Sequence, residues 1–303
     1  MPETMPAISL AALPGRRHAI LELASEAESR GFAGIYCPSL SDNMALCGAL
    51  ALTTKTITFG TSITPIYLRS VIDFANNAAF IHETSGRRFR FGIGVSHGPM
   101  LKRIGATAGK PLGDMRKFVE DFKAAERTGD KPPLVLATLR QKMIALAAEI
   151  GDGMVFANAA RSHMGTSLGA LPAGKATDES FYIGNMIPTC IADDEQAAMA
   201  VNRRTLGSYA LLENYRNYWK EAGYVEEMEA VEKVVAAGEP GRAGECLSDK
   251  WLADTTLFGS VAKVREGVEA WRAAGVKTPI LVPSSASGNQ FDAIRELFAA
   301  FSD

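Results

Sequence analysis

Eight short apolar segments are spaced along the 303-residue chain, and a stretch with helical periodicity follows nearly every one. They are rich in β-branched and large apolar residues, as in PPLVLAT (132–138) and GDGMVFAN (151–158). Strands that alternate with helices form parallel sheets, and short apolar strands of this kind are typically covered on both faces. The segments are centred near residues 8, 35, 60, 92, 135, 155, 186 and 280.

The number and spacing of these units favour a (β/α)8 TIM barrel, a fold that reaches this length as one domain. An open doubly wound sheet is the alternative. We therefore predict a single domain over residues 1–303, with insertion segments near 97–112 and 225–256. The second insertion is helical in composition and lacks a clear strand. A long helix is expected from Asp193 to about Ala222.

Composition excludes several classes of partner. The net charge is −2 with no basic stripe, so we expect neither nucleic acid nor a membrane surface as a partner. The beginning of the chain lacks the positive charge of a signal peptide, and no apolar run is long enough to span a membrane. Four scattered cysteines without a C-x-x-C pair predict free thiols in a reducing compartment and no metal site. We predict a cytoplasmic protein that acts on a small molecule.

The segment RRFRFGIGVSHGPM (87–100) combines a strand, three glycines and a histidine. The spacing of Gly92, Gly94 and Gly98 is close to a dinucleotide-binding fingerprint. That fingerprint needs a helix that starts directly at the loop. Pro99 and a broken, basic stretch follow instead, so the sequence disfavours a dinucleotide-binding loop here.

A barrel strand accounts for the same segment differently, because its alternate residues point outward to the helices and inward. The outward set is Phe89, Phe91, Ile93 and Val95, and the inward set is Arg90, Gly92, Gly94 and Ser96. The glycines would then leave room for a flat ring. His97 would lie at the carboxyl end of the strand, the face that carries the active site in such barrels. The alternative is a hydrogen-bonded structural histidine.

Three stretches, FGTSITPI (59–66), residues 75–105 and residues 134–156, together resemble the bacterial luciferase-like superfamily. The GRRFRFGIGVSHGP run is the most specific, and it is similar to the branch of coenzyme F-420 (deazaflavin)-dependent oxidoreductases. The resemblance implies hydride transfer between a reduced deazaflavin and an unidentified small organic substrate. Three alternatives stay open: an FMN-dependent monooxygenase supplied by a separate flavin reductase, a flavin-binding barrel without catalysis, and an unrelated barrel lyase or isomerase.

The resemblance also implies where the cofactor binds. In this superfamily the third strand carries a bulge with a non-prolyl cis peptide behind the cofactor ring, which corresponds here to Ser62-Ile63. The cofactor phosphate binds at the ends of the fifth and sixth strands, where helix N-termini offer free N–H groups. Thr138 and Asn158 could instead act as helix N-caps. The residues at those two ends are Thr138, Leu139, Arg140, Ala157, Asn158 and Ala159.

His97 matches a position that holds a catalytic glutamate in the sugar-phosphate dehydrogenase of the deazaflavin group. A histidine can exchange protons near neutral pH, so the resemblance implies a general acid/base role for His97, with Ser96 as a neighbouring cofactor contact. The histidine that this relative carries after its second strand is replaced by Leu40, with Asp42 two residues on. This replacement argues against a sugar phosphate as substrate. The family also implies a homodimer that pairs through helices near the second and third units.

Overall fold

The computed structural model describes residues 5–301. Within them the chain divides into two compact units. The first contains the chain up to Phe156 together with residues 170–184, and the second contains residues 157–169 and those from Asn185 onward. All eight predicted strands are present. The single domain over residues 1–303 stays a prediction.

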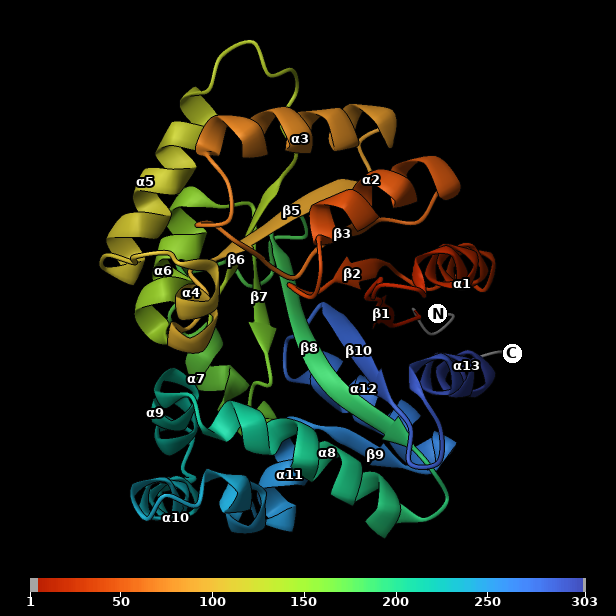
Figure 1. Cartoon of the computed structure of the whole chain (residues 1–303), viewed down its shortest axis with the longest axis vertical. Coiled ribbons are helices and arrows are strands. Elements are labelled where there is room, and N and C mark those ends of the chain that lie inside the picture. Colours follow the sequence, from red (N-terminus) through yellow and green to blue (C-terminus); the bar gives the residue numbers. More distant parts are fainter. Residues whose placement is uncertain (1–4, 302–303) are drawn as a thin grey trace. The chain divides into compact units, whose positions relative to one another are not determined.

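Parallel strands alternate with helices along the first unit, and the helices α1, α2, α3, α5 and α6 pack side by side in that order (Figure 1). The strands pair in the order β1, β2, β3, β5, β6, β7, and the short β4 pairs with β5. The strands are β1 (Ala7–Ser9), β2 (Ile35–Cys37), β3 (Phe59–Thr61), β4 (Thr64–Pro65), β5 (Phe89–Gly94), β6 (Leu134–Ala137) and β7 (Gly153–Ala157). The helices are α1 (Arg17–Ser29), α2 (Asn43–Thr53), α3 (Val71–Thr84), α4 (Gly98–Ile104), α5 (Pro111–Ala124) and α6 (Gln141–Ile150).

Aromatic rings fill the layer between β5 and the helices α3 and α5. The ring centroid of Phe91 lies 5.6 Å from that of Phe74 and 5.5 Å from that of Phe122. Burying a phenylalanine stabilises the fold by roughly 1.5–3 kcal/mol, so this layer fixes which face of β5 meets the helices. Since side chains alternate along a strand, Arg90, Gly92 and Gly94 lie on the opposite face, as predicted.

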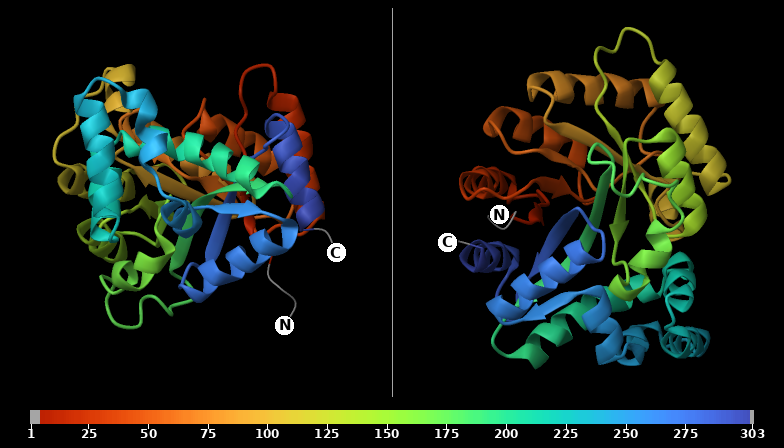
Figure 2. Two further views of the ribbon diagram at one scale, coloured as in Figure 1. Left: turned by 90° about the horizontal axis from the view of Figure 1, so that it is seen from below. Right: turned by 180° about the vertical axis from the view of Figure 1, so that it is seen from behind.

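The second unit is built around β8 and the strands beside it. β8 begins with three residues of the first unit and pairs in parallel with β9, with Thr189 opposite Leu257. Helices α8, α12 and α13 pack on these strands (Figure 2). The strands are β8 (Tyr182–Ile191), β9 (Leu257–Gly259) and β10 (Thr278–Ser284). The helices are η1 (Arg161–His163), α7 (Met164–Leu168), α8 (Glu195–Ala210), α9 (Glu213–Glu221), α10 (Val225–Ala236), η2 (Pro240–Cys246), α11 (Asp249–Thr255), α12 (Val261–Ala273) and α13 (Gln290–Ala300).

Three local expectations need correction. The long helix expected from Asp193 divides into α8 and α9 around Leu211–Leu212, and Asp194 caps α8 by accepting a hydrogen bond from the Ala197 N–H. Strand β9 was missed at the end of the helical insertion. The stretch after His97 is not wholly irregular, because α4 begins at Gly98 and places Pro99 in its first turn, where no N–H is needed.

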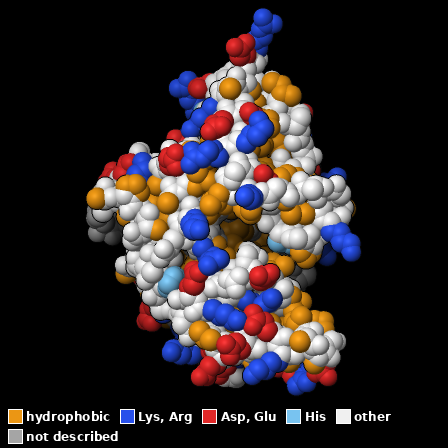
Figure 3. All heavy atoms as spheres, turned by 90° about the vertical axis from the view of Figure 1, so that its left-hand side faces the viewer, with side chains coloured by type: hydrophobic (Ala, Val, Ile, Leu, Met, Phe, Trp, Pro, Cys, Tyr) orange, Lys and Arg blue, Asp and Glu red, His pale blue; other side chains and the backbone are white. Residues whose placement is uncertain are grey.

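The remaining side chains with possible chemistry are mostly in the core. Trp251, Trp271 and Phe258 are buried, and His82 is buried on α3. All four cysteines are free, as predicted. Over residues 5–301, the structure contains no helix of the length and apolarity that a membrane crossing requires. Basic and acidic side chains are interspersed with apolar ones on the face in Figure 3, with no stripe of a single sign.

Candidate functional site

A break in the third strand forms the centre of the candidate site. Between β3 and β4 the Ser62–Ile63 peptide bond is cis, at the position that the family resemblance implies. The Ser62 N–H donates to the carbonyl of Cys37 on β2 at 2.8 Å. The Ile66 N–H donates to the carbonyl of Gly94 on β5 at 3.0 Å. We call residues Thr61–Thr64 the β3 bulge; it is held from the strands on both sides.

The glycines of β5 have a different role from the one that the sequence predicts. A Cβ on Gly92 would lie 1.9 Å from the carbonyl oxygen of Thr61, and a Cβ on Gly94 would lie 2.7 Å from the Cδ1 of Ile63. The space beside these glycines is therefore filled by the β3 bulge, not left open for a ring. The expectation of an empty space at Gly92 and Gly94 is wrong, and the glycines position the bulge instead.

Asn43, the first residue of α2, holds the β3 bulge from the other side. Its buried amide donates to the carbonyls of Cys37 and Ile63, both at 3.2 Å, and its Oδ1 accepts from Thr64 Oγ1 at 3.0 Å. Thr61 Oγ1 donates to the Gly92 carbonyl at 2.6 Å. Sequence reasoning missed Asn43 and Thr61. The signal for Asn43 was an amide directly after the Asp42 helix cap.

His97 lies three residues beyond β5, between Ser96, which has a positive φ of 63°, and helix α4. Its carbonyl accepts the Leu101 N–H. Its Nδ1 is buried and has no hydrogen-bond partner among residues 5–301. Burial lowers the pKa of His97 below its usual value of 6.5, and the nearby Arg103 charge lowers it further. Its surroundings therefore favour the neutral imidazole, and one ring nitrogen is left unused.

The side chains after β2 do not supply a second proton-transfer group. Leu40 is 52% exposed. Asp42 accepts the Ala45 N–H as the N-cap of α2, and its other oxygen pairs with Arg69 at 2.6 Å. Asp42 therefore has a structural role, and His97 remains the candidate for proton transfer.

The end of β6 carries a further unsatisfied polar atom. Thr138 Oγ1 is buried and forms no hydrogen bond in the part of the chain that the structure describes. Thr138 is not the N-cap of α6; that position belongs to Arg140, whose side chain makes no capping bond. The first N–H groups of α6 therefore have no side-chain cap. Leu139 is half-buried, and Arg140 is exposed.

Ala157 ends β7 in the second unit, and Asn158 and Ala159 follow it. The backbone groups of Asn158 are already hydrogen-bonded, but its buried Nδ2 has no partner among residues 5–301. Asn158 has a positive φ of 57°, its N–H donates to the Met186 carbonyl, and its carbonyl accepts from Trp219 Nε1 at 3.1 Å. It is not a helix N-cap, because Ala160 holds that position for η1.

The N–H groups that follow also have protein acceptors. The Ala160 N–H donates to the Tyr218 hydroxyl and the Ser162 N–H to the Asp254 carboxylate. Few backbone N–H groups are thus left at this strand end for an anion, and the unpaired donor here is the Asn158 side-chain amide. The cofactor contacts assigned to Ala157–Ala159 stay a prediction.

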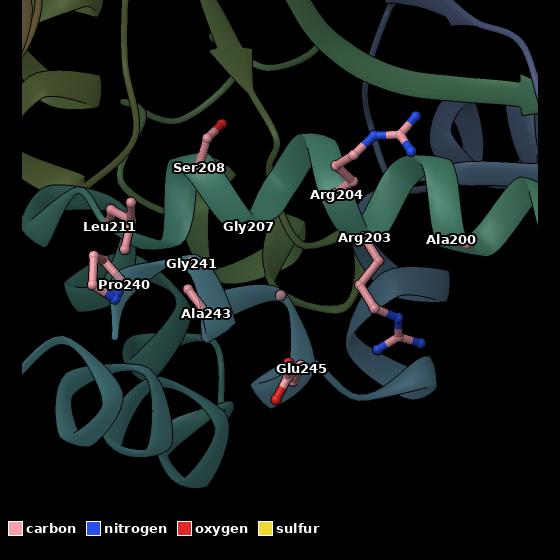
Figure 4. A pocket seen from close by; sticks show the side chains of 11 residues that line it. Ala200, Arg203, Arg204, Gly207, Ser208, Leu211, Pro240, Gly241, Ala243 and Glu245 are labelled. Carbon is pink, nitrogen blue, oxygen red and sulfur yellow. The ribbon is translucent and has the colours of Figure 1, made fainter. Parts of the chain in front are cut away.

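A separate cavity of about 470 Å³ lies in the second unit between α8 and η2. Among its charged lining residues, Arg203 bonds to the Leu247 carbonyl and to Asp249, and Arg204 points to the other side of α8 (Figure 4). None of the predicted site residues line this cavity. It is not a second candidate for the active site.

Comparisons with known proteins agree on the family and the fold. The model of a family described as luciferase-like monooxygenase matches residues 6–278. A Mycobacterium tuberculosis protein predicted to be a coenzyme F-420-dependent oxidoreductase is 26% identical over 91% of this chain and 93% of its own length.

Solved structures include the coenzyme F-420-dependent tetrahydromethanopterin reductase of Methanopyrus kandleri, with a TM-score of 0.74, 17% identity and coverage of 98% of this chain and 97% of the other. The oxygenating constituent of the Pseudomonas putida 3,6-diketocamphane monooxygenase, solved with FMN, has a TM-score of 0.63 and 16% identity, covering 98% and 95%. The chain therefore has the luciferase-like (β/α)8 TIM barrel fold, as predicted.

Proposed function

The chain belongs to the luciferase-like monooxygenase family, and from this premise we propose that it is an oxidoreductase that transfers hydride between reduced coenzyme F-420 and a small organic substrate. The Mycobacterium tuberculosis relative and the Methanopyrus kandleri enzyme, both named for coenzyme F-420, support the deazaflavin. The family likewise includes enzymes that use FMN.

One observation carries this proposal. Ser62 Oγ, Thr138 Oγ1 and His97 Nδ1 are buried polar atoms for which residues 5–301 provide no partner. They follow the neighbouring strands β3, β6 and β5, whose carboxyl ends lie at one edge of a parallel sheet. An unpaired buried polar group costs about 1–3 kcal/mol. A polar cofactor with several hydrogen-bonding groups fits this set, because it would satisfy atoms that the protein leaves unpaired.

Each group of residues at this edge of the sheet would have its own role in hydride transfer. A bound deazaflavin supplies hydride transfer at its ring. The β3 bulge, fixed by Asn43 and by the glycines of β5, presents a rigid surface with the Ser62 hydroxyl for orienting a ligand. The surroundings of His97 favour its neutral form, so its Nδ1 can take up or return the proton that accompanies hydride transfer.

Titrating the purified protein with coenzyme F-420 and, separately, with FMN tests the proposal by fluorescence. We expect micromolar binding of the deazaflavin and much weaker binding of FMN. Tight binding of FMN alone would assign the protein to the FMN-dependent monooxygenases. Binding of neither would reject the proposal. Replacing His97 with alanine removes one of these hydrogen-bonding atoms, so deazaflavin binding should weaken by at most about tenfold, whereas turnover should fall by roughly 10²–10⁴-fold; full turnover would exclude His97 as the acid/base.

A further inference from the structure

Arg90 lies in a row of three residues that face away from the helices of the first unit. Tyr36 on β2 is opposite Gly60 on β3, and Gly60 is opposite Arg90 on β5. Gly60 has no room for a side chain, since a Cβ there would lie 2.5 Å from the Arg90 carbonyl oxygen. The Arg90 side chain therefore crosses the glycine and reaches Tyr36.

Two tyrosines surround the Arg90 guanidinium. Its Nη1 donates to the Tyr36 hydroxyl at 3.1 Å, and its Cζ lies 5.0 Å from the centroid of the Tyr182 ring. The two tyrosine rings are 5.5 Å apart. Tyr182 is itself fixed, because a Cβ on Gly184 would lie 2.6 Å from its hydroxyl oxygen. We call Tyr36, Arg90 and Tyr182 the Arg90 cluster.

The charge of this cluster is not balanced by the protein. No carboxylate within residues 5–301 forms an ion pair with Arg90, whose half-buried guanidinium has only the two tyrosines as neighbours that favour its charge. A buried charge is costly unless it is paired or fully hydrogen-bonded. Because the guanidinium has five N–H donors, the single bond to Tyr36 leaves most of them without a protein acceptor.

Arg88, two residues earlier on the chain, shows how the same side chain is satisfied when its role is structural. Its nitrogens donate to the carbonyls of Ser85, Ile57, Ala51 and Thr54 and to the Thr54 hydroxyl, at 2.7–3.2 Å. Arg88 is therefore anchored without a carboxylate. Arg90 has one such acceptor, so the contrast points to a ligand in place of protein acceptors.

We propose that the Arg90 cluster is an anion site that binds the carboxylate of a small organic acid. A guanidinium matches a carboxylate with two parallel N–H bonds, and the flanking tyrosines provide a hydroxyl and an aromatic surface for the rest of a planar acid. The inference rests on the first unit alone. It does not depend on which cofactor the protein uses. It predicts that the unknown substrate, or an effector, is a carboxylic acid.

Thermal unfolding with sodium benzoate, compared with sodium chloride at the same ionic strength, tests this site. Ligands that bind the folded state raise the melting temperature in a concentration-dependent way. We expect benzoate to stabilise the wild-type protein and to change the ultraviolet difference spectrum of its tyrosines. Equal melting temperatures of the wild-type protein in both salts at every concentration would show that the Arg90 guanidinium binds water and not carboxylate. This result alone would overturn the proposal.

Two variants place the effect at Arg90. Arg90→Met should abolish the benzoate shift, whereas Arg87→Met, which removes an exposed arginine paired with Asp130, should keep it. An equal shift in both variants would overturn the assignment. If Arg90→Met does not fold, Tyr36→Phe removes only the hydroxyl that positions the guanidinium and should weaken benzoate binding about fivefold. Unchanged affinity in a folded Tyr36→Phe would also overturn it. Deazaflavin titration of the same variants separates this site from the proposed cofactor site.

Discussion

The carbonyl oxygen of Thr61 lies 1.9 Å from where a Cβ of Gly92 would be. The Thr61 hydroxyl also donates to the Gly92 carbonyl at 2.6 Å, so both the backbone and the side chain of Thr61 contact Gly92. This contact explains why glycine occurs in the GIG segment of β5. The strand lacks side chains there because its neighbour needs the space, and the shape of the β3 bulge depends on it.

Replacing Gly92 with alanine should therefore disturb the β3 bulge. Because the obstructing atom belongs to the backbone, the clash cannot be relieved by a rotamer change. We expect the free energy of unfolding to fall by about 2–3 kcal/mol, in the upper range of overpacking changes. Chemical denaturation measures this loss. Gly98→Ala is the matched control, since a Cβ at Gly98 would meet no atom within 4 Å, and the two variants should differ clearly.

Asn43 should contribute as much as Gly92 to holding the β3 bulge in place. Asn43→Ala removes three hydrogen bonds and leaves the carbonyl of Ile63 and the Thr64 hydroxyl without this partner. We expect a loss of about 2–3 kcal/mol in unfolding free energy, since buried groups left unsatisfied cost about 1–3 kcal/mol. It should also weaken cofactor binding, measured by fluorescence titration. Asn76→Ala, at an exposed position of α3, should change neither quantity; equal effects from both variants would show that Asn43 does not hold the β3 bulge.

Much of this arrangement could be predicted from sequence, and the reasons for success and failure are physical. The eight strands were recognised because apolar runs between turn residues carry their own signal. The position of the cis bond followed from the resemblance of FGTSITP to its family. The role of Asn43 could not be predicted, because its partners Cys37 and Ile63 meet it only in the folded chain. The break between α8 and α9 was missed because neither glycine nor proline marks Leu211–Leu212.

The acid–base behaviour of His97 can be measured without a substrate. Burial and the Arg103 charge both disfavour its protonated form, so its pKa in the folded protein should lie below 6.5. Nuclear magnetic resonance titration of the four histidines measures this value. Arg103→Met should raise the pKa of His97 toward 6.5, because it removes the repelling charge. Lys102→Met is the control and should leave the pKa unchanged.

The same shift predicts a direction for activity. If neutral His97 accepts the proton, turnover should fall as the pH drops through the lowered pKa, and the acid limb should move to higher pH in Arg103→Met. If the acid limb of the pH profile instead stays where it is in Arg103→Met although the measured pKa of His97 rises, another group limits turnover.

The homodimer that the family resemblance implies stays a prediction, and α2 and α3 carry a surface suited to it. These helices pack against each other and expose Leu52 by 75% and Phe80 by 62%. Large apolar side chains gathered on neighbouring exposed helices favour association. We expect a mass near twice 32.4 kDa in analytical ultracentrifugation. Phe80→Glu should shift the protein to monomers, because dimerisation would bury the new charge, whereas Leu211→Glu, on the second unit, should not. A monomeric wild-type protein, or a dimer that Phe80→Glu leaves intact, would show that this surface is not the interface.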